Sequence, residues 1–411
     1  MPRISPELCA RCKGYKRLCG LPRCPILEAF KAQVSAATRI QGTLLDGSTP
    51  PGILVGEHGY PRVRVYYMVP PGIHGEDARY YEAPVEWARR GEPLARVIQL
   101  RAGLVSASLR VDVGDPYRLY ETEVGLAAIS EKPVDSEVLL AKPPSPRLAF
   151  DGVSKPRGPS APAEEIRVQG DPRPPRPLER AVFEDAPAVD IAWELYRRGV
   201  AVYDIQRAMS LGFLGRRRAR RIVPTRWAIT AVDEILSQRL RETLQGADTI
   251  GEVEVYRGEY LGNRFIVVLL PGPGTFEWIE AWQPMTLWTR TARRIVVWRV
   301  EEDPLGRKTA EDGGFSAAKL TVLEHLAGRG RTADVVILRE ITPSYYAPVG
   351  NWHIRETVRR ALKRGPVARA SSLEEVISVI EESLGDPQAL LSKSMLLPGG
   401  KYRRTRVTDF F

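Results

Sequence analysis

The sequence predicts an α+β protein with more than one domain. Its 411 residues exceed a typical single domain, and 43% hydrophobic with 27% charged residues is ordinary globular usage. Strand-like segments dominate the first part of the chain, whereas strands and helices mix in the second part. We therefore expect mixed or antiparallel sheets with helices, together with a small N-terminal cysteine head and a flexible C-terminal tail.

The first part is predicted to be mostly β. A head at residues 1–30 precedes residues 31–142, in which the alternating segment 62–69 and a similar one at 107–113 predict half-buried strands. Residues 143–178 then contain 10 prolines. Because proline cannot donate to a sheet ladder or continue a helix, this segment predicts a linker.

The second part, residues 179–391, is predicted to be α+β. Apolar spacing predicts helices at 190–198, 205–211, 228–241, 317–326, 353–363 and 373–383. Short apolar or alternating segments predict strands at 252–256, 265–270, 294–300 and 334–341. The remaining residues, 392–411, are polar and basic until their end and predict a flexible tail.

The chain is basic, with 60 Lys and Arg against 50 Asp and Glu and a formal net charge of +10. Most of the basic residues are arginine, whose planar guanidinium suits phosphate and carboxylate equally. The composition favours a polyanionic partner such as DNA, but surface ion pairs of a thermophilic protein produce the same bias, so both interpretations stay open. No apolar run is long enough to span a membrane, and the N-terminus lacks a secretory signal, so we expect a cytoplasmic, nucleoid-associated protein.

All four cysteines lie in the head, in the spacing C-x2-C-x6-C-x4-C. They are Cys9, Cys12, Cys19 and Cys24. Four thiolates on a short loop suit a tetrahedral Zn²⁺, and a complete set of four protein ligands makes the metal structural. An iron–sulfur cluster and disulfides are the alternatives to zinc.

Residues 214–226 form an arginine-rich segment. Its candidate phosphate-binding residues are Arg216, Arg217, Arg218, Arg220, Arg221, Thr225 and Arg226. One interpretation is a surface that binds nucleic-acid phosphates in a salt-dependent way. The other is a solvated run of charge in which Thr225 is a helix N-cap and Trp227 a core residue.

No sequence motif identifies a reaction. The chain lacks HExxH, P-loop, GxGxxG and GxSxG patterns, so the catalytic residues are unknown. Glu301, Glu302 and Asp303 follow a predicted strand, where a nuclease holds Mg²⁺, although such a trio is more often a solvated strand end. An enzyme acting on nucleic acid or a nucleotide, with a phosphate pocket near Arg226, is therefore kept as the alternative to an adaptor that binds nucleic acid.

The chain ends in a polar segment followed by two phenylalanines. In peptides that bind sliding clamps, a glutamine precedes an aliphatic residue by three positions, and two aromatic residues follow three and four positions later. Val407, Phe410 and Phe411 match this pattern, while Arg404 stands at the glutamine position. The alternative is a tail that docks on its own domain.

Longer segments resemble the archaeal Nre family of DNA-repair proteins, of the NreA type. The resemblance rests on CARCKGYKRLCGLPRCPI at 9–26, VPTRWAITAVD at 223–233, FEWIEAWQP at 276–284 and PVGNWHIRETVRRAL at 348–362. It covers nearly the whole chain. It implies a role in DNA-damage repair, a zinc finger formed by the four cysteines, and recruitment to the sliding clamp PCNA through the C-terminal motif. It implies no catalytic residues.

Overall fold

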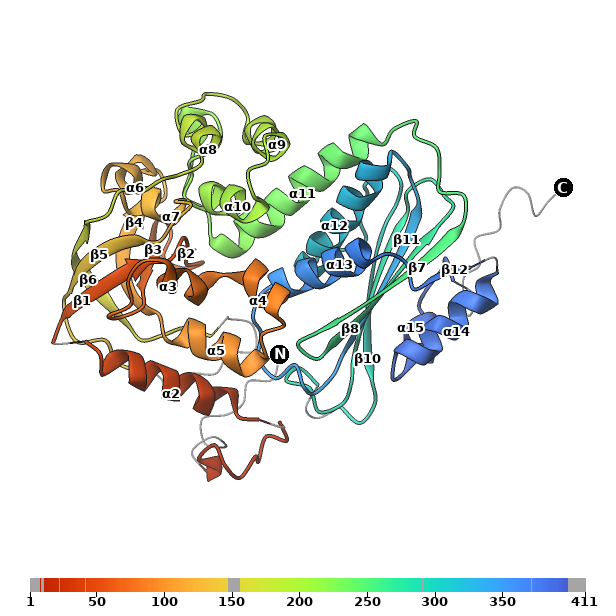
Figure 1. Ribbon diagram of the computed structural model, residues 1–411, viewed down its shortest axis with the longest axis horizontal. Coiled ribbons are helices and arrows are strands. Elements are labelled where there is room, and N and C mark those ends of the chain that lie inside the picture. The colour runs from red at the N-terminus through yellow and green to blue at the C-terminus, as the bar shows by residue number, and fades with distance from the viewer. Residues whose placement is uncertain are drawn as a thin grey trace. The chain divides into compact units, whose positions relative to one another are not determined.

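The computed structural model describes residues 8, 11–21, 23–40, 42–146, 156–289, 292–370 and 372–397 (Figure 1). The chain divides into two compact units. The first unit comprises residues 25–236, and the second comprises residues 1–24 with 237–411, so that the boundary falls inside helix α11 (Thr225–Thr243). Each unit combines helices with a six-stranded sheet, which confirms the predicted α+β class.

The sheet of the first unit has the strand order β1-β5-β6-β4-β3-β2, in which β4 and β6 run parallel and the other neighbours antiparallel. Its strands are β1 (Leu44–Thr49), β2 (Leu54–Val55), β3 (Arg62–Val69), β4 (Val105–Asp112), β5 (Val134–Leu140) and β6 (Ser160–Val168). On β3, the buried Val63 and Val65 alternate with the exposed Arg62 and Arg64. The alternation seen in the sequence therefore places arginines on the solvent side of this strand.

Helices surround this sheet. They are α2 (Pro25–Ala37), α3 (Glu76–Arg79), α4 (Pro84–Arg90), α5 (Leu94–Ala102), α6 (Tyr117–Glu121), α7 (Val124–Ala128), α8 (Arg176–Ala181), α9 (Ala188–Arg197) and α10 (Val202–Ser210), with the 3₁₀ turns η1 (Tyr80–Glu82) and η2 (Arg217–Ala219). In Figure 1, α2 and α5 lie below the sheet and α8 lies above it. The helices α3 to α7 lie where mostly strands were predicted, because helices of four to nine residues give too few turns for a periodic signal.

The proline-rich stretch 143–178 contains strand β6, which lies between β5 and β4. Pro162 tolerates this position because its carbonyl accepts the N–H of Ala141 at 2.9 Å, and an acceptor is all that a proline offers to a ladder. The start of α8 follows at Arg176. Part of the predicted linker is therefore sheet, and residues 147–155 lie outside the described part of the chain.

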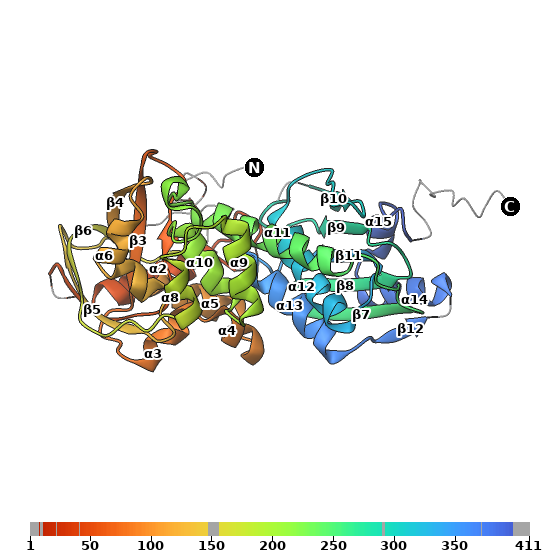
Figure 2. The same ribbon diagram turned by 90° about the horizontal axis from the view of Figure 1, so that it is seen from above.

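The second unit is built around the sheet β10-β9-β11-β8-β7-β12, in which β9 and β11 run parallel. Its strands are β7 (Val253–Tyr260), β8 (Asn263–Leu270), β9 (Phe276–Trp282), β10 (Val296–Glu302), β11 (Asp334–Ile341) and β12 (Ala368–Ala370). Its helices are α12 (Gly313–Arg329), α13 (Trp352–Arg364), α14 (Leu373–Ser383) and α15 (Pro387–Leu391). Figure 2 shows α12 and α13 on one face of the sheet and α14 and α15 on the other, which explains why β11 is buried along its whole length.

Two buried glutamates attach the C-terminal segment to this sheet. Glu340 on β11 accepts the backbone N–H of Gly385, and Glu277 on β9 accepts the hydroxyl of Ser394 at 2.5 Å. Leu397 is also buried. The packed chain therefore extends beyond residue 392, where the tail was predicted to begin.

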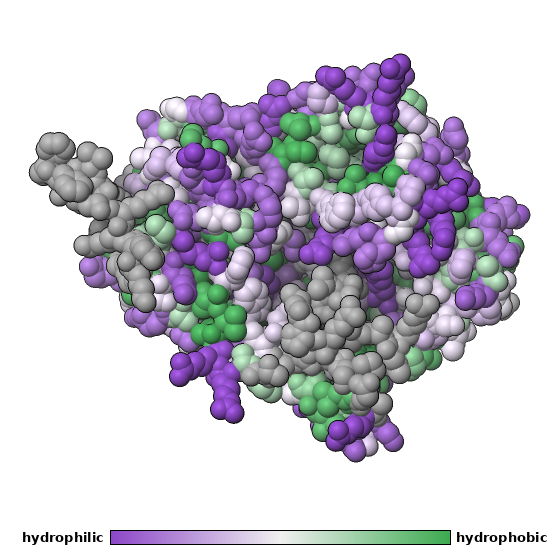
Figure 3. Space-filling model, turned by 180° about the vertical axis from the view of Figure 1, so that it is seen from behind, coloured by the Kyte–Doolittle hydropathy of each residue, from purple (hydrophilic) through white to green (hydrophobic). Residues whose placement is uncertain are grey.

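Hydrophilic side chains dominate the face of the molecule shown in Figure 3, and apolar residues there form separate patches. Among the described residues, no helix is both long and apolar enough to cross a membrane.

Candidate nucleic-acid interface and charged interior

The arginine-rich segment connects the end of α10 to the start of α11. The N–H of Ile222 donates to the carbonyl of Val113, just after β4, at 2.8 Å. The N–H of Val223 donates to the carbonyl of Ser210, at the end of α10, at 2.9 Å. The segment is thus fixed beside the end of β4, and its side chains project from a defined backbone.

Arg220 differs from its neighbours because it is buried, with 3% of its surface exposed. Its guanidinium donates to the carbonyls of Val182 and Glu184, next to the C-terminal end of α8, and to that of Gly215 at 2.8 Å. Carbonyls at a helix end lack intrahelical partners, so a cation there stabilises the helix. Burial lowers the pKa of Arg220, and its donors are engaged by the protein itself. We conclude that Arg220 has a structural role.

Arg216, Arg218 and Arg221 are exposed. Arg217 is exposed too, but its guanidinium donates to the carbonyl of Phe183 at 2.7 Å. The segment predicted as one patch therefore contains arginines in different environments.

Thr225 connects α11 to the sheet. Its Oγ1 accepts the N–H of Val55, on the edge strand β2, at 2.8 Å and lies 3.0 Å from the Oγ of Ser210. The neighbouring Arg226 is largely exposed and lies 3.8 Å from Glu57, an ion pair of little strength at the surface. Thr225 thus holds the first turn of α11 against β2, which places Arg226 at the surface.

Trp227 and Tyr60 form an exposed aromatic pair. Their ring centroids are 6.4 Å apart with planes inclined by 17°, and the two residues are 54% and 49% exposed. The interpretation of Trp227 as a core residue is therefore wrong. Exposed aromatic rings beside cations are the usual means by which proteins stack on nucleic-acid bases.

Three further arginines extend this surface along the sheet. Arg64 on β3 lies directly opposite Arg110 on β4, and Arg62 lies two residues before Arg64. All three are exposed, and among the described residues none has a carboxylate partner. Since like charges directly opposite one another destabilise a sheet, this arrangement favours an anionic ligand. We call the combined surface the aromatic–arginine patch: Tyr60, Arg62, Arg64, Arg110, Arg221, Arg226 and Trp227.

The sequence analysis missed part of this patch. The alternation in RVRVYY predicted a strand with outward arginines, but nothing local joined it to Arg226, more than 150 residues later. The hydrogen bond between Thr225 and Val55 supplies that link.

In the second unit, one arginine of the sheet is buried. Arg339 on β11 is 7% exposed and donates to Glu280 on β9 and, through Nη2, to Oδ1 of Asn263 at 2.7 Å. The Nδ1 of His353 lies 2.7 Å from the carbonyl of Gly350, so its proton is on Nδ1 and its Nε2 accepts from Arg339 at 3.3 Å. This buried network is satisfied internally.

Burial perturbs both acid–base groups of this network. Loss of solvation raises the pKa of Glu280 to about 7, against the opposing effect of Arg339. Loss of solvation and the charge of Arg339 lower the pKa of His353 to about 3, so the imidazole is neutral at pH 7. Both shifts follow from the cost of placing charge in a medium that solvates it poorly.

The acidic trio Glu301, Glu302 and Asp303, at the end of strand β10, is also engaged internally. Glu302 is 2% exposed and binds Arg241 of α11 and Lys319 of α12, the latter at 2.6 Å. Asp303 accepts the N–H of Arg307 at 2.9 Å in its own turn, which lowers its pKa. Among the described residues, no three His, Cys, Asp or Glu side chains gather as metal ligands would.

The cysteine head is described in part. Cys12 is buried, Cys19 and Cys24 are half-buried, and Cys9 lies outside the described residues. The loop between Cys12 and Cys19 turns tightly, with Gly14 at a φ of 79°. The three described cysteines do not by themselves form a metal-binding group. The four-thiolate zinc site thus stays a prediction.

The candidate clamp peptide lies outside the described residues as well. Arg404, Val407, Phe410 and Phe411 all fall within 398–411.

Two family models match this chain, and together they include residues of both units. The model of the archaeal Nre N-terminal region matches residues 18–289, and that of the archaeal Nre C-terminal region matches residues 302–410. No solved structure matches the chain.

Curated relatives match over most of their length. The DNA repair protein NreB of Archaeoglobus fulgidus is 37% identical over 400 residues, which are 96% of this chain and 98% of the relative. The DNA repair protein NreA of the same organism is 37% identical, over 87% of this chain and 89% of the relative. The DNA repair protein NreA of Haloferax volcanii is 34% identical, over 93% and 92%. Since the family models and these relatives span both units, the chain belongs to the archaeal Nre family.

Proposed function

We propose that this chain is a DNA-repair protein that binds DNA through the aromatic–arginine patch of its first unit. The names of its relatives support a repair role. The observation that carries DNA binding is the exposed Tyr60–Trp227 ring pair on the same surface as Arg62, Arg64 and Arg110, which have no carboxylate partner within the described ranges. Guanidinium groups bind phosphates without regard to sequence, and aromatic rings stack on any base.

This patch favours DNA whose bases are accessible. In an intact duplex the base faces are stacked inside the helix, whereas a single strand or a distorted site exposes them. We therefore expect the protein to prefer single-stranded or locally unpaired DNA to a perfect duplex, with salt sensitivity set by the arginines.

Fluorescence anisotropy with a labelled single-stranded oligonucleotide tests this proposal. Replacing Tyr60 and Trp227 together with Ala removes two rings worth about 1–3 kcal/mol per stacked base, so affinity should fall about tenfold or more. Arg180→Ala removes an exposed arginine of α8 outside the patch and serves as the control. If the wild-type protein binds no DNA at low salt, or if the double variant binds as tightly as the control, the proposal is wrong.

The proposal includes recruitment to the sliding clamp PCNA by the C-terminal peptide. Its support is the spacing of Val407, Phe410 and Phe411. Removal of residues 404–411 should abolish capture of PCNA and leave DNA binding unchanged, and Arg404→Gln should strengthen capture by restoring the polar anchor. A truncated protein that captures PCNA as well as the full chain would contradict this part alone.

It also includes a structural zinc ion bound by Cys9, Cys12, Cys19 and Cys24. The zinc assignment is supported by the presence of four thiols within 16 residues, a ligand set that prefers Zn²⁺ over harder metals. Metal analysis of the purified protein should find one zinc per chain, and Cys12→Ser should lower that content. Iron with visible absorbance, or no metal at all, would overturn the zinc assignment.

A further inference from the structure

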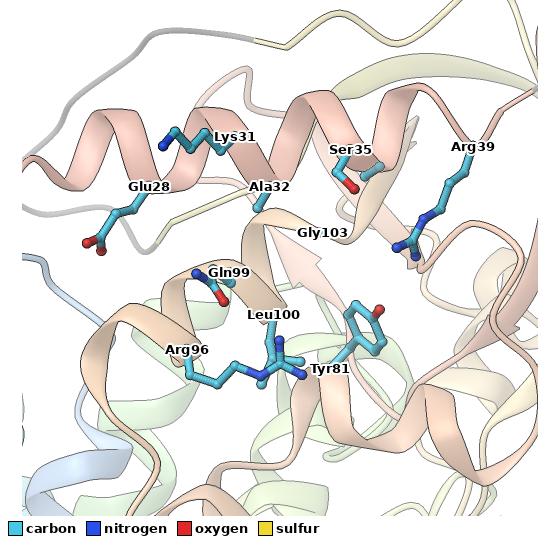
Figure 4. A pocket seen from close by; sticks show the side chains of 11 residues that line it. Glu28, Lys31, Ala32, Ser35, Arg39, Tyr81, Arg96, Gln99, Leu100 and Gly103 are labelled. Carbon is cyan, nitrogen blue, oxygen red and sulfur yellow. The ribbon is translucent and has the colours of Figure 1, made fainter.

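A pocket opens in the first unit between helices α2 and α5, and no residue of the aromatic–arginine patch lines it (Figure 4). Its volume is about 500 Å³, within the range of small-ligand sites. One face of α2 contributes residues at helical spacing from Glu28 to Ala36, Arg39 follows just after the end of α2, and α5 contributes Arg96 and Gln99. The 3₁₀ turn η1 adds Tyr81.

The floor of the pocket is apolar and formed by small side chains. Ala36 and Leu100 are buried there, and Ala32 lies beside them. Gly103 closes the pocket next to Tyr81: a Cβ at this position would lie 3.2 Å from the Cε1 of the tyrosine ring. The absence of a side chain at residue 103 therefore gives Tyr81 its place in the wall.

The rim carries an excess of positive charge. Lys31, Arg39 and Arg96 line the pocket, against the single carboxylate of Glu28. Across the described ranges, none of these three cations has an ion-pair or hydrogen-bond partner. In Figure 4 the guanidinium group of Arg39, which follows α2, and that of Arg96 on α5 reach toward Tyr81.

We propose that this pocket binds a nucleoside phosphate, either free or at the end of a DNA strand. Arg39 and Arg96 hold the phosphate by charge-assisted hydrogen bonds from two sides. The ring of Tyr81 and the apolar floor take up the base and sugar, and Gln99 and Ser35 offer hydrogen bonds to their polar edges. The site is separate from the aromatic–arginine patch and does not depend on it.

Isothermal titration calorimetry with deoxynucleoside 5′-monophosphates tests this site. The full-length wild-type protein should bind at least one of them with an affinity on the order of 10–500 µM, because a small ligand with one phosphate offers few atoms to contact. Arg39→Ala and Arg96→Ala should each weaken binding about tenfold, and the corresponding nucleoside without phosphate should bind as weakly. Arg180→Ala should change nothing.

A second variant separates shape from charge. Ser35→Trp keeps all three cations and fills the pocket from the exposed face of α2, so it should abolish binding while circular dichroism and thermal unfolding stay as in the wild type. Oligonucleotides with a 5′-phosphate or a 5′-hydroxyl, tested in the Tyr60/Trp227 double-alanine background, distinguish a strand end from a free nucleotide. Absence of nucleotide binding in the wild type, or binding that survives both Arg96→Ala and Ser35→Trp, would overturn the proposal without bearing on the DNA-binding patch.

Discussion

The arginines on strands β3 and β4 of the first unit and the arginine on strand β11 of the second unit have opposite environments. In the first unit, Arg62, Arg64 and Arg110 stand on the solvent side of a sheet, and Arg64 faces another arginine across the strands. In the second unit, Arg339 on β11 is buried and binds Glu280 and His353. The same residue type is an external charge in one region and an internal hydrogen-bond donor in the other.

This difference explains why the composition is ambiguous. An excess of arginine indicates either a polyanionic partner or a network of ion pairs, and the chain contains exposed arginines without a carboxylate partner among the described residues as well as a buried arginine ion pair. Burial and partners, which composition does not report, decide which role a given arginine has. Substitutions in the two regions should therefore affect different measurable properties.

The largest effect is expected for Arg339→Met. The change leaves Glu280 buried without its cation and removes donors from Asn263 and His353. Breaking a buried ion pair by removing one partner costs about 3–5 kcal/mol, so urea-induced unfolding should move to much lower denaturant concentration.

A double variant separates loss of packing from loss of charge pairing. Arg339→Met with Glu280→Leu removes both charges and should recover part of the stability that the single variant loses. If Arg339→Met alone unfolds at the wild-type urea concentration, the buried pair does not hold the second unit together, and the contrast between the units disappears.

The next effect concerns DNA binding by the first unit. Replacing Arg62, Arg64 and Arg110 together with Ala removes up to three cations that can neutralise phosphates. The slope of log affinity against log salt should therefore fall by about 1 for each phosphate that the variant no longer neutralises. Anisotropy titrations at several salt concentrations measure this slope. An unchanged slope would mean that these arginines face only solvent.

A smaller effect is the pH dependence of stability that Glu280 and His353 of the second unit produce. Unfolded, Glu280 returns toward a pKa of 4.5 and His353 toward 6.5, against about 7 and about 3 in the folded protein. Between about pH 4.5 and 6.5 the folded protein holds the glutamate proton and the unfolded chain holds the histidine proton. The two linkage effects therefore cancel in this window.

Single variants should expose each effect. Glu280→Gln leaves His353, so stability should fall steadily as pH decreases from about 6.5 to 3, because the unfolded chain then binds the extra proton. His353→Gln leaves Glu280, so stability should fall as pH rises from about 4.5 to 7, since the folded protein then binds the extra proton. Denaturant titrations across this range measure both slopes, and identical profiles for the two variants would contradict the assignment.

Much of the fold was predictable from local pattern. Strands β3 and β11 and helix α14 begin and end at the predicted residues, because each has a clear alternation, a continuous apolar run or a helical period. Strand β9 was not predicted. Its sequence FEWIEAW contains Glu277 and Glu280, whose burial depends on partners far away in the sequence.

For the candidate sites, too, local sequence pattern does not reveal which residues are buried by distant partners. The arginine-rich segment was visible in the sequence, but its position did not reveal that Arg220 is buried while its neighbours are exposed. Likewise, nothing local distinguishes Trp227 from a core tryptophan until the contact with Tyr60 is known. Sequence pattern identifies residue types suited to a role, whereas the fold decides which of them are available for it.

The smallest expected effect is on the stability of the first unit. It tests most directly whether the exposed arginines of β3 and β4 differ in role from the buried Arg339. The triple variant of Arg62, Arg64 and Arg110 to Ala removes exposed side chains that have no carboxylate partner among the described residues. Exposed substitutions of this kind change stability by about 0.5 kcal/mol or less, and relief of the opposed pair Arg64 and Arg110 acts in the stabilising direction.

Urea unfolding of the triple variant should therefore overlap with that of the wild type or shift slightly toward higher denaturant, while its DNA affinity falls. Raising the salt concentration should narrow any difference in stability between the triple variant and the wild type, because salt screens the repulsion between Arg64 and Arg110 that the variant removes. A loss of stability comparable with that of Arg339→Met would mean that the exposed arginines also hold their unit together. In that case the exposure of an arginine would not predict whether it contributes to DNA binding or to stability in this protein.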